Sequence, residues 1–270
     1  MSERVSVSIQ DGVADVRLNR PEKMNALDQA MFEALVETGM RLAEDPAVRS
    51  VVLSGEGRAF CAGLDFASFM AMAGDGSRKT DGGGLLRRPE GSPANHAQSA
   101  AYVWMSLPVP VIAAVHGVAF GGGLQIALGA DVRYVTADAK LSVMEIKWGL
   151  IPDMTGTQTL RRLLRLDVAK ELTFSGRIVS GQEAVDLGLA THVSDKPLDD
   201  AMALAREIAQ KSPNAIRAAK KLLNESGLVT LEDGLRLEEQ LQLGLIGSPN
   251  QIEAVRANVE KRSPRFKDQE

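Results

Sequence analysis

Residues 5–9 and 14–18 each alternate between apolar and polar side chains, and Asp11-Gly12 lies between the two runs. A period of two residues is that of a strand with one buried face, and Asp-Gly favours the tight turn of a hairpin. The chain is therefore predicted to open with a β-hairpin.

The next apolar residues follow helical spacing. Met31, Leu35 and Leu42 lie close to one face of a helix, and Asp28 precedes them as a candidate N-cap. These residues predict a helix from Asp28 to about Asp45.

Short apolar runs then alternate with helical stretches. Strands are predicted at 50–53, 111–115 and 132–135, and the last two of these runs are too short and too rich in β-branched residues for helices. Helices are predicted near 122–129 and 156–165. This alternation indicates the α/β fold class.

The pattern changes towards the C-terminus. Ser180-Gly-Gln-Glu183 is a capping-box sequence that opens a short helix, and from about Leu198 the chain is nearly all helical. The predicted organisation is a core at 1–197 followed by a C-terminal helical subdomain at 198–270.

The composition narrows the function classes. A formal net charge of −4 over 270 residues gives no electrostatic case for nucleic acid as a partner. One cysteine, Cys61, and three histidines cannot form a disulfide or a zinc cluster, so no metal site is predicted.

The glycine-rich residues 74–95 are predicted to form a mobile surface segment. With no apolar signal core and no apolar run long enough to span a bilayer, we expect a soluble, cytoplasmic protein without a membrane partner.

Two glycine-containing turns are candidates for holding an anion or a polarised carbonyl. Ala119-Phe-Gly-Gly-Gly-Leu-Gln-Ile-Ala127 lies between an apolar strand and a helix, so unpaired backbone N–H groups would face a ligand there. A tight turn that needs glycine only for packing is the alternative. The segment 58–65, Arg-Ala-Phe-Cys-Ala-Gly-Leu-Asp, can present a further backbone N–H.

Glu145 and Asp153 are two carboxylates eight residues apart around an apolar stretch. Carboxyl groups in apolar surroundings have raised pKa values and can exchange protons near neutral pH. The alternative is that Glu145 pairs with Lys147 and that Asp153 caps a helix beginning near Met154.

Taken in order, these segments resemble the crotonase (enoyl-CoA hydratase/isomerase) superfamily over essentially the whole chain. The matching segments are Asn19-Arg-Pro-Glu-Lys-Met-Asn-Ala-Leu27, Phe60-Cys-Ala-Gly-Leu-Asp65, Val115-His-Gly-Val-Ala-Phe-Gly-Gly-Gly123, residues 173–189 and Lys261-Arg-Ser-Pro-Arg-Phe266. The resemblance implies a crotonase-type spiral of β-β-α units with a C-terminal helical part that packs subunits into homotrimers, often paired as hexamers. It also implies an acyl-CoA thioester as substrate. Coenzyme A is then part of the substrate, and no separate cofactor is implied.

The resemblance also assigns roles by position. The backbone N–H groups of Leu64 and Gly122 would hold the thioester carbonyl as it becomes an enolate. Glu145 matches the second of the two glutamates of a typical hydratase, and Gln125 stands in place of the first. Glu145 and Asp153 together match the glutamate and the aspartate of dienoyl-CoA isomerases, which makes them the predicted catalytic pair. Further substrate contacts are implied at Ala62, Asp65, Gly121, Gln125 and Phe266.

Three functions remain open at this stage. The first is isomerisation of an enoyl- or dienoyl-CoA, with Glu145 and Asp153 as proton shuttles, and the presence of both carboxylates favours it. The second is hydration by Glu145 with Gln125 positioning the water. The third is non-catalytic binding of an acyl-CoA. The basic pairs Arg161-Arg162 and Lys220-Lys221 are interpreted as solvated helix faces.

Overall fold

A six-stranded sheet forms the centre of the molecule. The computed structural model describes residues 3–65, 67, 70 and 84–268, and the strand order of this sheet is β1-β2-β3-β4-β6-β9. Its strands are β1 Val5–Gln10, β2 Val13–Leu18, β3 Ser50–Gly55, β4 Val111–Val115, β6 Val132–Val135 and β9 His192–Val193. β1 and β2 are antiparallel and the other neighbours are parallel, so the predicted hairpin and the predicted α/β fold class are confirmed.

Three short strands form a second, smaller sheet. It contains β5 Val118–Phe120, β7 Lys140–Ser142 and β8 Val179–Ser180. β4 passes into β5 through Gly117, whose φ is +62° and whose added Cβ would lie 2.0 Å from the Arg58 carbonyl oxygen. Only glycine fits this step between sheets. β5 then leads into the helix α4, which gives one β-β-α unit of the expected spiral.

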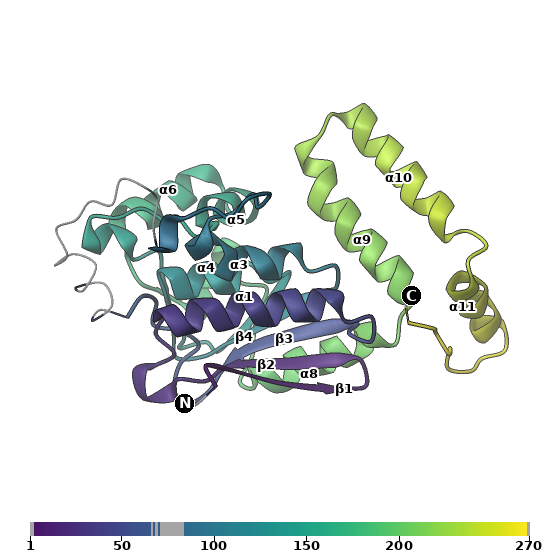
Figure 1. Ribbon diagram of the computed structural model, residues 1–270, viewed down its shortest axis with the longest axis horizontal. Coiled ribbons are helices and arrows are strands. Elements are labelled where there is room, and N and C mark those ends of the chain that lie inside the picture. Colours follow the sequence, from purple (N-terminus) through teal and green to yellow (C-terminus); the bar gives the residue numbers. More distant parts are fainter. Residues whose placement is uncertain (1–2, 66, 68–69, 71–83, 269–270) are drawn as a thin grey trace.

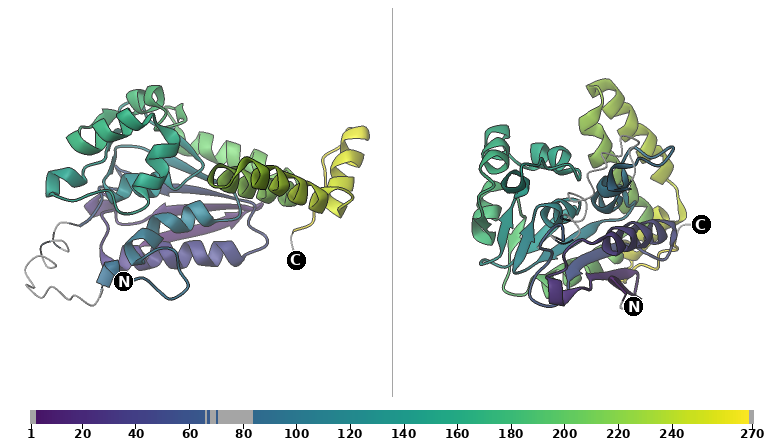
Figure 2. Two further views of the ribbon diagram at one scale, coloured as in Figure 1. Left: turned by 90° about the horizontal axis from the view of Figure 1, so that it is seen from above. Right: turned by 60° about the vertical axis from the view of Figure 1, so that its left-hand side comes forward.

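Helices cover both faces of the large sheet (Figures 1 and 2). α1 Gln29–Glu44, α3 His96–Ser106 and α4 Gly122–Leu128 share one apolar core with strand residues such as Val51 and Ala113. α8 Pro197–Ala209 covers the opposite face, where Ala201, Ala205 and Ala209 pack on Val52 and Ile112. Alanines four residues apart lie on one helix face, and their small side chains let α8 approach the sheet closely.

The predicted helix boundaries follow identifiable caps. Asp28 caps α1 by accepting a hydrogen bond from the Met31 N–H at 2.9 Å, and Ser180 caps α7 Gly181–Leu187 by accepting from Glu183 N–H. α4 and α5 Gly156–Leu163 confirm the helices predicted near 122–129 and 156–165. The remaining helices of the core are α6 Leu166–Ser175 and the 3-10 turns η1 Pro21–Lys23, η2 Gly84–Leu86 and η3 Glu145–Trp148.

The last helices leave the body of the molecule as an arm. α9 Pro213–Glu225, η4 Ser226–Leu228, α10 Leu231–Leu245 and α11 Pro249–Val259 extend from one side of it (Figures 1 and 2). The division at residue 198 stays a prediction. Because α8 packs on the sheet, the helices that stand apart from the core begin at α9.

Of the glycine-rich segment predicted at 74–95, residues 74–83 lie outside the described residues. Within the described part of the chain, no helix combines the length and the apolar character needed to cross a membrane.

Candidate functional site

A cavity of about 550 Å³ opens where the two predicted glycine turns meet. Three polar side chains reach its wall, those of Gln125, Glu145 and Asp153. The other lining residues are apolar or glycine: Leu27, Phe32, Ala62, Gly63, Leu64, Leu85, Leu86, Ala97, Phe120, Gly121, Gly122, Met144, Trp148, Leu150, Ile151 and Met154. Such a wall suits an apolar chain with a few directed polar contacts.

Backbone hydrogen bonds join the two turns to each other. Cys61 N–H donates to the Val118 carbonyl at 3.0 Å, and Phe120 N–H donates to the Cys61 carbonyl at 3.1 Å. Gly63 has φ +86°, and a Cβ added there would lie 2.6 Å from the Phe120 carbonyl oxygen. The close contact of the turns therefore requires glycine at position 63.

The two predicted oxyanion donors lie on the cavity wall. Leu64 and Gly122 both line it, and a Cβ added at Gly63 between them would be 3.8 Å from the Gly122 nitrogen. In the described part of the chain, neither the Leu64 N–H nor the Gly122 N–H donates to a protein acceptor. Two unpaired backbone donors on one cavity wall can stabilise an oxygen that gains negative charge.

The sequence analysis missed Asn25, which holds the first turn in place. Asn25 is fully buried, and its Nδ2 donates to the carbonyl oxygens of Glu56, Ala59 and Phe60 at 3.0, 2.8 and 3.1 Å. Its Oδ1 accepts from the Arg20 N–H at 2.8 Å. Its φ of +55° belongs to the left-handed region that asparagine adopts more readily than most residues.

Glu145 is the buried carboxylate of the site. It begins the turn η3, and its side chain is largely shielded from solvent. Its Oε1 accepts a 2.6 Å hydrogen bond from Gln125 Nε2, whereas its Oε2 is buried without a partner in the described residues. Burial raises the pKa of Glu145, the hydrogen bond from Gln125 lowers it, and the negative charge of Asp153 adds to the rise.

Asp153 lines the same cavity and remains exposed. Partial loss of hydration against the cavity wall raises the pKa of its carboxyl group.

The two alternative interpretations, a pair between Glu145 and Lys147 and a helix cap by Asp153, are wrong. Thr155, not Asp153, is the N-cap of α5, and the Lys147 ammonium lies 5.5 Å from the Trp148 ring centre instead of pairing with Glu145.

Gln125 is 2% exposed and makes three hydrogen bonds. Its Oε1 accepts from the backbone N–H groups of Met154 and Gly156 at 2.8 and 2.9 Å, while its Nε2 donates to Glu145. The amide oxygen is therefore already occupied. One amide N–H remains that could donate to a water, so the alternative in which Gln125 positions water stays a prediction.

The other predicted substrate contacts divide into two groups. Ala62 and Gly121 line the cavity, as expected. Asp65 is not on its wall: its carboxylate accepts from Arg20 at 2.7 Å and from the Ala67 N–H at 2.9 Å, so it braces the first turn. Phe266 is not among the residues that line the cavity in the chain's own fold, and its carbonyl accepts from Arg49.

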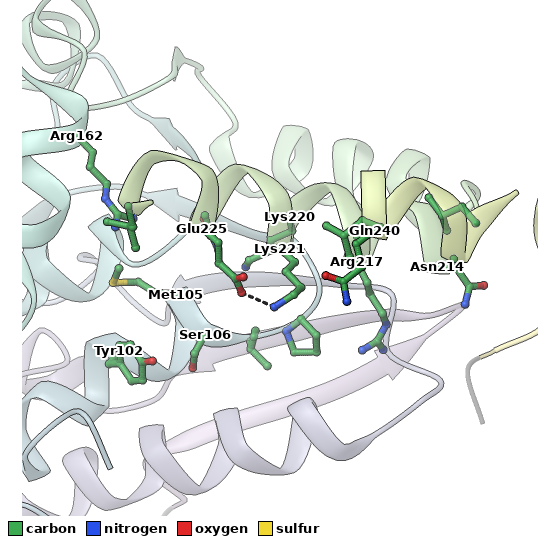
Figure 3. Close-up of a pocket in the computed structure, with 18 residues that line it drawn as sticks. Tyr102, Met105, Ser106, Arg162, Asn214, Arg217, Lys220, Lys221, Glu225 and Gln240 are labelled. Atoms are coloured by element: carbon green, nitrogen blue, oxygen red, sulfur yellow. Dashed lines mark hydrogen bonds and ion pairs between the residues drawn. The ribbon is translucent and has the colours of Figure 1, made fainter. Parts of the chain in front are cut away.

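A second cavity, of about 790 Å³, lies between the C-terminal end of α3 and the helices α9 and α10 (Figure 3). Two of its basic residues already have acidic partners. Lys220 is 7% exposed and donates to Asp131 and the Val109 carbonyl at 2.7 and 2.9 Å, and Lys221 pairs with Glu225. The interpretation of Lys220 as a solvated residue is therefore wrong, because it anchors α9 to the sheet.

No group of histidine, cysteine and acidic side chains suited to a metal ion occurs among the described residues. Cys61 is buried, its Sγ–H donates to the Asn25 carbonyl, and burial raises its pKa to about 12. The thiol therefore packs between the turns and is not a reactive thiolate.

Comparison with known proteins shows the family to which the chain belongs. A family model described as enoyl-CoA hydratase/isomerase matches residues 8–269. A Bacillus subtilis (strain 168) protein described as "Probable enoyl-CoA hydratase" is 35% identical, with 97% of this chain and 98% of that protein aligned. The mouse mitochondrial Delta(3,5)-Delta(2,4)-dienoyl-CoA isomerase is 34% identical over 94% of this chain and 79% of its own. The crystal structure of enoyl-CoA hydratase from Bacillus anthracis superposes with a TM-score of 0.88 at 32% identity, covering 98% of this chain and 100% of that one.

Proposed function

The chain belongs to the enoyl-CoA hydratase/isomerase family of the crotonase superfamily, and we propose that it isomerises the double bond of an enoyl- or dienoyl-CoA. The observation that carries this proposal is the composition of the cavity wall. It holds two carboxyl groups with raised pKa values, Glu145 and Asp153, and an amide, Gln125, where a second glutamate would serve hydration. Isomerisation needs proton removal at one carbon and proton return at another, and two such carboxyls supply both.

The position of each carboxyl assigns its role in the proposal. A Cβ added at Gly121 would lie 3.3 Å from Glu145 Oε1, so Glu145 is adjacent to the Gly122 N–H that would hold the thioester oxygen. Glu145 Oε2 then removes the proton from the carbon next to the thioester, and the electron pair moves onto the oxygen held by Leu64 and Gly122. Asp153, the exposed carboxyl of the two, returns a proton farther along the chain. Losing one backbone donor of this kind typically costs about 3–4 kcal/mol of transition-state stabilisation.

The substrate proposal follows from the lining. Apart from the three polar residues, the described cavity wall is apolar. The proposed substrate is therefore a coenzyme A thioester whose acyl group is a hydrocarbon chain. Hydration by Glu145 is the second candidate, because the Bacillus subtilis relative carries a hydratase description.

The test incubates the purified protein with a 2-enoyl-CoA, a 3-enoyl-CoA and a 3,5-dienoyl-CoA in heavy water, and follows products by mass spectrometry. A shifted double bond with deuterium but without added water is the expected result. A 3-hydroxyacyl-CoA product would establish hydration instead. Binding of the thioesters without conversion would favour the non-catalytic alternative.

A further inference from the structure

The Gln125 side chain connects the two carboxyl-bearing segments of the site. Its Nε2 donates to Glu145 Oε1 at 2.6 Å, and its Oε1 accepts from the backbone N–H groups of Met154 and Gly156 at 2.8 and 2.9 Å. Met154 directly follows Asp153 in the chain. One buried amide thus contacts the base on one side and the backbone that carries the second carboxyl on the other.

The orientation of this amide is determined by its neighbours. Two N–H donors face one end of the amide, so that end must be the oxygen, and the nitrogen must face Glu145. Gly156 makes the approach possible, because a Cβ added there would lie 2.6 Å from Gln125 Oε1. The reversed amide would put its nitrogen against two donors and its oxygen against a carboxylate.

We propose that Gln125 is a positioning residue that sets the geometry of the two carboxyl groups relative to each other. Its Nε2–H fixes Glu145 Oε1 and so leaves Oε2, which has no partner among the described residues, as the oxygen that takes the substrate proton. Its Oε1 fixes the backbone that follows Asp153. The roles of the carboxyls rest on the proposed function, whereas the control of the Glu145 carboxyl by Gln125 does not.

The bridge needs an amide because it requires a donor at one end and an acceptor at the other. Leucine at 125 would supply neither. An ionised glutamate would accept from the two backbone N–H groups but would place a second negative charge against Glu145, where two carboxylates cannot both stay ionised. A protonated glutamate would restore the missing donor.

The hydrogen bond from Gln125 also favours the ionised form of Glu145. Asp153 is the charged group that acts against it. Helix α4, which carries Gln125, contains no charged residue, and Lys147 of the Glu145 turn lies over the Trp148 ring. The charged residues of the nearby helices α5 and α6 are exposed: Arg161, Arg162, Asp167, Lys170 and Glu171. Loss of the Gln125 bond should therefore raise the pKa of Glu145 further.

The first measurement uses hexanoyl-CoA, a saturated thioester that can be neither isomerised nor hydrated. In heavy water, removal of its α proton by Glu145 and return of a deuteron label the α carbon, which mass spectrometry detects. Gln125→Leu should lower the exchange rate at pH 7 about 10²-fold, the loss expected from a misplaced catalytic group, and should move the acid limb of the pH profile to higher pH. The matched control Gln158→Leu changes an exposed amide whose one side-chain partner among the described residues is its neighbour Thr157, and should leave rate and profile unchanged.

Gln125→Glu provides the second variant and keeps the volume of the side chain. While the new carboxyl is protonated it can donate to Glu145, so this variant should exchange faster than Gln125→Leu at low pH and lose that advantage as pH rises. Equal losses in both variants with unchanged pH profiles would mean that Gln125 only supports packing, and would overturn the proposal. So would a wild-type rate in Gln125→Leu.

The proposal stays testable if the isomerisation itself fails. A wild-type protein that exchanges the α proton but moves no double bond would contradict the proposed function and leave the Gln125 comparison intact. If there is no exchange either, infrared titration of the Glu145 carboxylic acid band, with Glu145→Gln as the reference, needs no turnover. Gln125→Leu should raise the midpoint of that titration, and an unchanged midpoint would overturn the role of Gln125.

Discussion

Water reaches the two carboxyl groups of the site to different extents. Glu145 is buried, with one oxygen bonded to Gln125 and the other without a partner among the described residues, whereas Asp153 lines the same cavity and remains exposed. Both carboxyls have raised pKa values, and loss of hydration is the main cause for each. A buried base next to the oxyanion donors and a solvent-accessible partner give a route by which a proton can be taken up, exchanged with water and returned.

Removal of either carboxyl should abolish most of the turnover. We expect Glu145→Gln and Asp153→Asn each to lower kcat by about 10²- to 10⁴-fold, the range for loss of a general acid or base. The affinity for a CoA thioester should stay close to wild type, because the amides keep the shape of the cavity. Steady-state kinetics and calorimetric titration measure the two effects. Wild-type turnover in both variants would rule out the proton-shuttle roles.

The raised pKa of Glu145 predicts a pH-dependent cost in stability. In the unfolded chain the Glu145 carboxyl has its ordinary pKa of 4.5, and in the native state its pKa is higher. The native state therefore binds the proton of this carboxyl more tightly, and this contribution to stability is lost as pH rises through the folded pKa. Glu145→Gln removes that loss. Urea denaturation should show a larger free energy of unfolding for the variant than for wild type at pH 8, and a smaller difference at pH 4.5. A difference that does not change with pH would contradict this account.

Only part of the residue-level arrangement can be predicted from the sequence. Glu145 and Asp153 stand out because they are carboxylates around an apolar stretch, and the structure brings both to one cavity. The bonds of Gln125 could not be foreseen, because they depend on backbone N–H groups at 154 and 156 that turn towards α4 only in the folded chain. The same holds for the Asn25 Nδ2 group, whose carbonyl acceptors lie more than thirty residues away.

At the scale of elements, the site depends on the contact between two turns. One follows a strand of the six-stranded sheet, and the other follows a strand of the three-stranded sheet. The turn after β3 and the turn between β5 and α4 each contribute one backbone donor, from Leu64 and Gly122, that has no acceptor among the described residues. Because the backbone, not a side chain, supplies both donors, their spacing is set by how closely the turns pack.

Gly63→Ala tests that packing. Its new Cβ would lie 2.6 Å from the Phe120 carbonyl oxygen, in addition to occupying a left-handed backbone conformation. Gly91→Ala is the matched control, since Gly91 also has positive φ, +75°, but has nothing within 4 Å of an added Cβ. The control should cost about 1 kcal/mol of unfolding free energy with normal turnover. Gly63→Ala should cost more and should lower kcat at least tenfold. Equal kinetics in the two variants would contradict the role of the turn contact.

The elements that the sequence predicted are those with a periodic pattern and a cap. α1 has both, since apolar residues at helical spacing follow the N-cap Asp28. η3, which positions Glu145, spans only four residues and has no periodic pattern to detect. α3 was not predicted, although Asn95 and Gln98 form a capping box at its start, because its alanine-rich sequence lacks a strong contrast between faces.

At the scale of the whole molecule, the arm formed by α9, η4, α10 and α11 exposes apolar side chains that the chain's own core does not cover. Lys220 fixes the base of the arm by its bond to Asp131, so the arm is held to the sheet at that end. Its exposed apolar residues are Leu223, Leu228, Val229, Leu231, Leu235, Leu243, Ile246, Ile252, Val255 and Val259. Exposed apolar surface of this extent is typical of a subunit interface.

The resemblance to the crotonase superfamily implies a homotrimer or a dimer of trimers, and we expect the apolar residues of this arm to lie in its subunit interface. Light scattering coupled to size-exclusion chromatography should give three or six times the 28.9 kDa of the chain. Leu235→Lys places a charge at an apolar residue that is 54% exposed on α10, and should shift the population towards smaller species because an unpaired charge at an interface is costly to desolvate. Met40→Lys, at a similarly exposed residue of α1, is the control and should leave the mass unchanged. A wild-type mass of one chain at all concentrations would show that the apolar face of the arm serves another purpose than self-association.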